Sequence, residues 1–218
     1  MFNPIPQSVT IGNTLYTGGG NDNVHISKAD GLAGLLGLYE VNVNGQKQYM
    51  TQQQLERTKF DLGSGNDTLV VDADVHVGIT AEGGSGHDTL VGGSGNDDLR
   101  GGSGSDAIFG RGGSDTIDGG SGSDWLDGGR GNDLINGGRG DDVQIGGSGN
   151  DFIRGGAGDD LQFGGTGNDI VSGGSGSDVQ FGGRGNDLLL GGSGSDVQVG
   201  GPGWDALFGG RGFDWQQA

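Results

Sequence analysis

A nine-residue unit repeats in one unbroken register from Gly83 to Gln217. The unit reads Gly-Gly-x-Gly-x-Asp-x-U-x, where U is usually aliphatic, and about fifteen copies begin at residue 83 and at every ninth residue up to 209. A short fixed period with an apolar residue in a fixed slot is typical of a solenoid, in which each unit packs on its neighbours. We therefore expect a thin core that grows coil by coil.

The composition is consistent with a solenoid once its pattern is considered. Glycine accounts for 56 of the 218 residues, which without a pattern would indicate disorder or collagen. The period of nine, rather than three, excludes collagen. Cysteine is absent, so the chain has neither disulfides nor thiolate metal sites.

The unit predicts the path of the chain through each coil. Its glycines can adopt positive φ without steric cost, so the first six residues can form a sharp loop. The following x-U-x should form a short strand with U facing the interior. If successive loops lie on opposite sides, two repeats make one coil of 18 residues, and repeat n stacks on repeat n+2. This predicts an all-β fold with two parallel sheets of short strands.

The same stacking would align the aspartates in two columns at the loop edges. Neighbouring carboxylates about 4.8 Å apart repel each other by roughly 1 kcal/mol in water. A hard divalent cation between successive loops reverses this repulsion, and Ca²⁺ accepts six to eight oxygen ligands in flexible geometry, whereas Mg²⁺ requires a tighter octahedron. The predicted metal ligands are Asp88, Asp106, Asp124, Asp142, Asp160, Asp178 and Asp196 in one column and Asp97, Asp115, Asp133, Asp151, Asp169, Asp187 and Asp205 in the other.

The nonapeptide resembles the RTX, or haemolysin-type, calcium-binding family over about three-fifths of the chain. The resemblance implies a right-handed parallel β-roll with up to about thirteen Ca²⁺ ions between repeats n and n+2. It also implies a secreted bacterial protein that stays unfolded at low calcium and folds outside the cell. Family members typically carry an uncleaved C-terminal segment that serves as their export signal. The repeats run almost to Ala218 and leave little room for such a segment, so the export route stays open.

The first 82 residues match the repeat only in part. Asp22 and Asp67 occupy its acidic slot and are added to the predicted calcium ligands. The pattern lapses at about 28–59, where we expect a strand at 39–43 that enters an Asn-Gly turn, and a short capped helix near 51–57. Alternation also suggests strands at 8–16 and 75–79. We interpret 1–82 as irregular N-terminal turns of the roll with one inserted excursion; an independent cap domain is the alternative.

One column departs from the aliphatic rule. Five successive U positions of one sheet are glutamines, which could form a buried amide ladder: Gln144, Gln162, Gln180, Gln198 and Gln216. The pleat places their neighbours outside, which predicts an apolar face for self-association or for a protein or glycan partner: Val143, Ile145, Leu161, Phe163, Val179, Phe181, Val197 and Val199.

The ends of the repeat array carry further irregularities. Trp204 and Phe213 replace the usual Asn or Ser in the last two repeats and suggest an aromatic cap that closes the 83–218 roll. Asp214 is therefore the least certain ligand. Arg111 replaces a second glycine, and we expect little cost because Gly112 and Gly113 follow it.

Charge and hydropathy limit the partners. The net charge of −18 argues against nucleic acid, which requires a basic face. No signal peptide of the Sec type and no apolar run of about 18 residues is visible, so we expect no membrane span.

The sequence gives no sign of catalysis. The three histidines are scattered and the common hydrolase, zinc and nucleotide motifs are missing, so we predict a protein that is not an enzyme. The alternative to a calcium-responsive roll is a polysaccharide or cell-surface recognition module of a larger RTX protein. Its basic stripe would be weak, because Arg130, Arg139, Arg184 and Arg211 fall in two different columns. Ice binding would need a rank of threonines, and only Thr166 occupies that slot.

Overall fold

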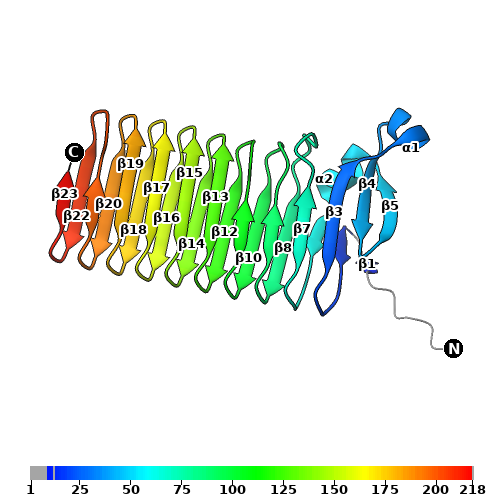
Figure 1. The fold of residues 1–218 in the computed structure, drawn as a ribbon, viewed down its shortest axis with the longest axis horizontal. Coiled ribbons are helices and arrows are strands. Elements are labelled where there is room, and N and C mark those ends of the chain that lie inside the picture. Colours follow the sequence, from blue (N-terminus) through cyan, green and yellow to red (C-terminus); the bar gives the residue numbers. More distant parts are fainter. Residues whose placement is uncertain (1–8, 12, 218) are drawn as a thin grey trace.

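The computed structural model describes residues 9–11 and 13–217 and shows an elongated, mostly β solenoid (Figure 1). Two sheets face each other, and from β6 onward their strands are parallel and the chain alternates between them. The antiparallel pairs, β1 with β2 and β4 with β3 and β5, lie in the N-terminal region. The first sheet has the strand order β1-β2-β6-β8-β10-β12-β14-β16-β18-β20-β22, and the second has β23-β21-β19-β17-β15-β13-β11-β9-β7-β3-β4-β5. The predicted fold of two parallel sheets is confirmed.

The strands of the first sheet are β1 (Val9–Ile11), β2 (Thr14–Tyr16), β6 (Lys59–Asp61), β8 (Thr80–Ser85), β10 (Asp98–Ser103), β12 (Thr116–Ser121), β14 (Leu134–Arg139), β16 (Phe152–Ala157), β18 (Ile170–Ser175), β20 (Leu188–Ser193) and β22 (Ala206–Arg211). Those of the second sheet are β3 (Asn23–Lys28), β4 (Tyr39–Val43), β5 (Gln46–Met50), β7 (Thr68–Val71), β9 (Thr89–Val91), β11 (Ala107–Phe109), β13 (Trp125–Arg130), β15 (Val143–Ser148), β17 (Leu161–Thr166), β19 (Val179–Arg184), β21 (Val197–Val199) and β23 (Trp215–Gln217).

The pairing register follows the 18-residue coil. Leu99 pairs with Ile117 in the first sheet, and Ile108 pairs with Leu126 in the second. Most strands are longer than the expected x-U-x, because the ladder continues through both glycines to the third loop residue; Gly147 pairs with Gly165, for example. Glycine leaves room for this close approach, since its Cα carries no side chain.

The core is one side chain deep in each sheet, as the repeat predicts. The U residues of the first sheet lie at the centre of the roll and are fully buried through most of its length, as Leu99, Ile135 and Val171 show. Residues on either side of U point outward, which gives the alternating burial of each strand.

The predicted glutamine ladder is present in the second sheet. Gln144, Gln162, Gln180 and Gln198 are fully buried. Each amide nitrogen from Gln162 onward donates to the side-chain oxygen of the glutamine one coil before it, at 2.6–2.8 Å. The other amide hydrogen reaches a backbone carbonyl of the opposite sheet, such as Ser172 O at 3.1 Å from Gln162 Nε2. The ladder therefore satisfies its own buried polar groups and ties the two sheets together.

The segment between β3 and β6 leaves the repeat pattern. It contains α1 (Gly31–Leu35), the hairpin of β4 and β5, and α2 (Gln52–Arg57). The predicted Asn-Gly turn is confirmed, with Asn44 at φ 53° and Gly45 at φ 85°. The predicted helix is also confirmed, and Thr51 and Gln54 close its N-terminus with a capping box. No helix in the described part of the chain is long and apolar enough to span a bilayer.

Two expectations for the early coils are corrected. The stretch 8–16 forms a hairpin of β1 and β2 rather than one strand, with residues 8 and 12 outside the described part. The stretch 75–79 is a turn region and not a strand, although Val75, Val77 and Ile79 are buried as alternation predicted. The residues between β7 and β8 depart from the repeat here, although β6 still pairs with β8 and β7 with β9.

Arg111 contacts the start of this irregular stretch. Its Nη1 donates to Val71 O at 2.8 Å and to Gly92 O at 3.3 Å. The cost of replacing glycine is visible in its left-handed φ of 71°. The arginine is therefore more than a tolerated substitution, because it supplies donors to carbonyls at the irregular junction.

The last coil differs from the expected aromatic cap. Trp204 and Phe213 are 90% and 94% exposed, so these two side chains do not cover the end of the core in the single chain. They occupy the loop position that Asn or Ser holds in most other repeats.

Candidate metal centre

Two ladders of aspartates run along the loop edges. The backbone N–H of each aspartate donates to Oδ1 of the aspartate one coil further on, at 2.7–3.2 Å: Asp22, Asp67, Asp88, Asp106, Asp124, Asp142, Asp160, Asp178, Asp196 and Asp214 along one edge, and Asp97, Asp115, Asp133, Asp151, Asp169, Asp187 and Asp205 along the other. Asp22 and Asp67 thus join the first ladder despite their irregular spacing in sequence. The structure brings together every aspartate singled out by the repeat.

In all of these aspartates except Asp97 and Asp214, the second carboxylate oxygen is buried and has no partner. From Asp67 to Asp196 the ladder residues are at most 3% exposed. The Oδ2 atoms without a hydrogen bond belong to Asp22, Asp67, Asp88, Asp106, Asp115, Asp124, Asp133, Asp142, Asp151, Asp160, Asp169, Asp178, Asp187, Asp196 and Asp205. Burying a carboxylate oxygen without a partner costs folding free energy. Because the same oxygen lacks a partner in repeat after repeat, we infer that a bound ligand interacts with it.

Backbone oxygens crowd the same place. A Cβ added to Gly146, the first glycine of its repeat, would lie 2.5 Å from Asp151 Oδ2 and 2.6 Å from the carbonyl oxygen of Gly164. At Gly182 the corresponding distances are 2.5 Å to Asp187 Oδ2 and 2.8 Å to Gly200 O. The carboxylate of one repeat and a carbonyl of repeat n+2 therefore converge beside a glycine Cα, where there is no room for a Cβ.

The donor set fits calcium. It consists of carboxylate and carbonyl oxygens held by glycine-rich loops, which is the chemistry and flexibility that Ca²⁺ requires. Within residues 9–11 and 13–217 no three His, Cys, Asp or Glu side chains cluster as a metal site would. Each site would instead combine aspartates of stacked repeats with backbone carbonyls, so an all-side-chain cage is not expected.

Burial controls the electrostatics of the ladders. Loss of water raises the pKa of Asp115, Asp142 and Asp160 to about 7, opposed by the backbone N–H bonded to each carboxylate. Burial likewise raises the pKa of Asp133 and Asp151 to about 6. Neighbouring carboxylates add to the upward shift. Without a cation, burial therefore shifts these carboxyl groups toward the neutral form.

This predicts a distinct pH dependence for metal-free protein. The folded-state pKa values lie above the ordinary value of 3.8, so the contribution of these groups to stability is fully present below pH 3.8 and is lost as the pH rises through about 6 to 7. In excess chelator, β structure measured by circular dichroism should increase as the pH falls from 8 to 5. An unchanged or weaker signal at pH 5 would contradict the shifts. With calcium present the trend should reverse, because protons compete with the metal.

Asp97 and Asp214 stand apart from the other aspartates. Asp97 Oδ2 accepts a hydrogen bond of 2.9 Å from Gly93 N, and its Oδ1 receives Ile79 N, so no acidic residue lies one coil before it. Asp214 lies in the exposed last coil. Position along the solenoid, which the repeat itself does not encode, distinguishes these two residues.

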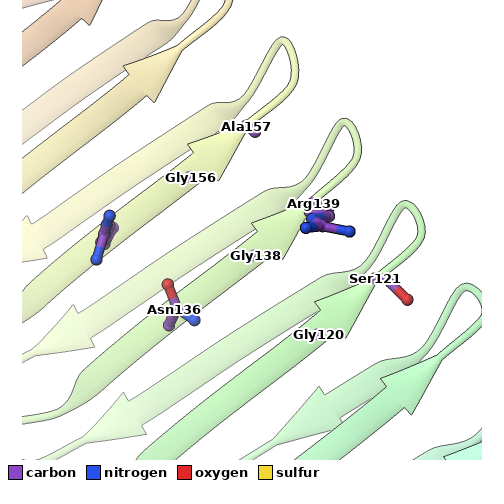
Figure 2. Close-up of a pocket in the computed structure, with 8 residues that line it drawn as sticks. Gly120, Ser121, Asn136, Gly138, Arg139, Gly156 and Ala157 are labelled. Carbon is purple, nitrogen blue, oxygen red and sulfur yellow. The ribbon is translucent and has the colours of Figure 1, made fainter.

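A shallow furrow crosses the outer face of the first sheet over β12, β14 and β16 (Figure 2). Its volume is about 520 Å³, and its floor is made of the second glycines of three stacked repeats, Gly120, Gly138 and Gly156. Arg139 and Arg154 also line it. Neither guanidinium has an ion pair in the part of the chain that the structure describes. Sequence reasoning noted Arg139 but missed Arg154, which lies on another column.

The outward side chains around the glutamine ladder are only partly exposed. Within this predicted apolar face Phe163 and Phe181 stack with their ring centroids 5.1 Å apart. The first sheet carries a second outward apolar column that sequence reasoning missed, in which Leu134, Phe152 and Ile170 are 46%, 43% and 37% exposed. The sequence indicates this column through the apolar residue that directly follows the aspartate in each of these repeats.

Comparison with known proteins agrees with the geometry. A family model for the RTX calcium-binding nonapeptide repeat matches residues 12–25, 82–117, 109–144, 145–180, 163–198 and 181–215. A search of curated proteins found no match. The matches cover more than half of the chain, include the aspartates of both ladders from Asp88 to Asp214, and extend to the irregular repeat around Asp22. The chain belongs to the RTX calcium-binding nonapeptide repeat family, and its solenoid is a calcium-binding β-roll.

Proposed function

We propose that this protein is a secreted, non-catalytic β-roll that folds when calcium binds outside the cell and then presents a surface for association. The observation that carries the proposal is the row of buried Oδ2 atoms without partners along both loop edges. These atoms destabilise the metal-free fold and become ligands once Ca²⁺ is bound.

The proposed ligands are the aspartates with unpartnered Oδ2 atoms and Asp97, together with carbonyls of the adjacent glycines. Asp22 and Asp67 are included because they continue the same ladder. Stacked pairs of the regular repeats provide up to about thirteen sites. Asp97 is the weakest of the proposed ligands from 88 to 205, since both of its oxygens already accept backbone hydrogen bonds.

Extracellular calcium modules typically have dissociation constants on the order of 10⁻⁴ to 10⁻³ M. Calcium inside a cell would then leave the roll unfolded and able to be exported, and calcium outside would fold it. Limited proteolysis tests this: at calcium well below about 10⁻⁴ M the repeats should be cut within the 83–217 stretch, and well above it they should be protected. Protection at both concentrations would contradict calcium-gated folding.

For the associating surface we propose the apolar face of the second sheet. Its eight side chains lie around the buried glutamine ladder and include the stacked Phe163 and Phe181. Sedimentation velocity in calcium should show a mass above that of the monomer, and F163S/F181S should reduce it. F152S in the first sheet is the matched control. If the wild type is monomeric, the face does not mediate self-association, and a different protein or a glycan becomes the proposed partner.

We further propose that residues 1–82 cap the N-terminal end of the roll. Val41, Val43, Met50 and Leu55 belong to the same hydrophobic cluster as the U residues of the repeats. This continuity of the core favours a cap over a domain that folds independently.

The furrow of Figure 2 favours a second candidate function, recognition of an acidic polysaccharide. Two arginines without ion pairs line a glycine-floored furrow in a protein of otherwise strongly negative charge, and arginine binds carboxylates in bidentate fashion. R139A/R154A should weaken binding of a polyuronate in calcium about tenfold or more, whereas R184A should not. Equal binding by all three proteins would remove this candidate.

A further inference from the structure

A strongly exposed apolar segment lies outside the repeats. Residues 31–37, which we call the leucine knuckle, read Gly-Leu-Ala-Gly-Leu-Leu-Gly and contain α1. Leu32, Leu35 and Leu36 are 74%, 86% and 68% exposed, and α1 buries no residue. Figure 1 shows α1 at the N-terminal end of the roll, projecting beyond the hairpin of β4 and β5. Calcium binding by the repeats does not explain this exposure.

The backbone of the knuckle is largely closed on itself. Gly34 N donates to Asp30 O, Leu36 N to Leu32 O, and Gly37 N to Gly34 O, at 3.0–3.2 Å. Leu38 N donates to Ala33 O at 3.1 Å, and Gly37 ends the turn at φ 69°. A segment that enters an apolar medium must satisfy its polar backbone groups internally, and the N–H groups of Leu36, Gly37 and Leu38 are satisfied in this way.

Charge is absent from the knuckle and present at its base. No residue of 31–37 is charged, whereas Lys28 and Asp30 precede the knuckle and Glu40 follows it. Lys28 pairs with Asp74 at 3.4 Å, and Glu40 pairs with Lys47 at 2.7 Å. An apolar tip above a charged base is the pattern of a segment that reaches into the boundary of a bilayer while its base stays in water.

We propose that the leucine knuckle inserts into the surface of a lipid bilayer and attaches the folded roll to it reversibly. The small area of the tip favours lipid over a second copy, because a stable protein interface buries about 800 Å² on each partner and three leucines provide far less. A bilayer also accepts a convex tip without a complementary pocket. Three partly inserted leucines compare with a single acyl chain, for which the binding constant is about 10⁴ M⁻¹.

The experiment uses the full chain in calcium and sucrose-loaded vesicles of phosphatidylcholine, which avoid repulsion of the acidic protein by anionic lipid. Wild type should sediment with the vesicles, and L32S/L35S/L36S should reduce the partition coefficient on the order of 100-fold. The control L134S/F152S/I170S removes three exposed apolar side chains from the first sheet and should bind as wild type does. Because α1 buries no residue, the knuckle variant should keep the calcium-dependent circular dichroism of the wild type.

Three results would overturn the proposal: no vesicle binding by wild type, equal binding by the knuckle variant, or a lipid-free dimer that the knuckle variant abolishes. The last would assign the knuckle to self-association. The proposal is independent of the calcium switch, since a roll that folds in calcium yet ignores vesicles rejects only the membrane contact, and a roll that fails to respond to calcium rejects only the proposed function.

Discussion

Removing calcium is expected to abolish the regular β structure of residues 83–217, and adding it back is expected to restore it in one steep transition. At a tenfold excess over the dissociation constant, each bound ion stabilises the folded state by about 1.4 kcal/mol. Over about thirteen proposed sites the sum exceeds the 5–15 kcal/mol that typically stabilises a whole domain. The metal-free chain must also bury carboxylates whose Oδ2 atoms have no partner. Metal binding is therefore expected to decide whether the chain is folded.

Far-UV circular dichroism during a calcium titration measures this transition. Magnesium is the control, because it holds its water and prefers a tighter octahedron, so it should fold the chain poorly. Light scattering on the same samples reports whether association begins at the same midpoint. A strong β signal in excess chelator at pH 8 would show that the ladders are tolerated without metal and would favour the recognition function instead.

Gly149→Ala is expected to destabilise the calcium-loaded roll by more than about 4 kcal/mol. The glycine lies at φ 131°, and an added Cβ would overlap the carbonyl oxygen of Gly131 one coil before it. Backbone on the neighbouring coil cannot move without breaking the ladder, so the clash is not relieved by a change of rotamer.

Gly20→Ala is the matched control. Gly20 occupies the same position of the first, irregular repeat at φ 105°, yet no atom lies within 4 Å of its added Cβ. The control should cost only the strain of left-handed backbone, about 1–2 kcal/mol. Urea unfolding in calcium gives both values, and similar losses for the two variants would show that strain, and not stacking, requires the glycine.

The repeat predicts whatever depends only on the neighbouring coils. The inward U positions, the alignment of Asp88 with Asp106 and the glutamine ladder all follow from an 18-residue coil, because stacked coils present identical positions to each other. A local Asn-Gly turn and a capping box were equally predictable, since each is specified by adjacent residues.

Features that depend on position along the solenoid were not predictable. The loss of a free oxygen at Asp97 results from residues inserted near 72–79, and the exposure of Trp204 results from the position of its loop at the last coil. The furrow combines side chains from three coils and two columns, and so does not belong to any single repeat. The projection of α1 depends on how the excursion folds over the hairpin, which no period describes.

The 18-residue register also has a mechanical consequence. Each regular coil is paired only with the coils directly before and after it in its sheet, as Leu99 pairs with Ala81 and Ile117. A chain pulled from its C-terminus would therefore unwind one coil at a time. Each event would release about 18 residues, or roughly 60 Å of extended chain, in place of a rise of about 4.8 Å along the roll. Under load the molecule would therefore lengthen in equal steps, and bound calcium would raise the force that each step requires.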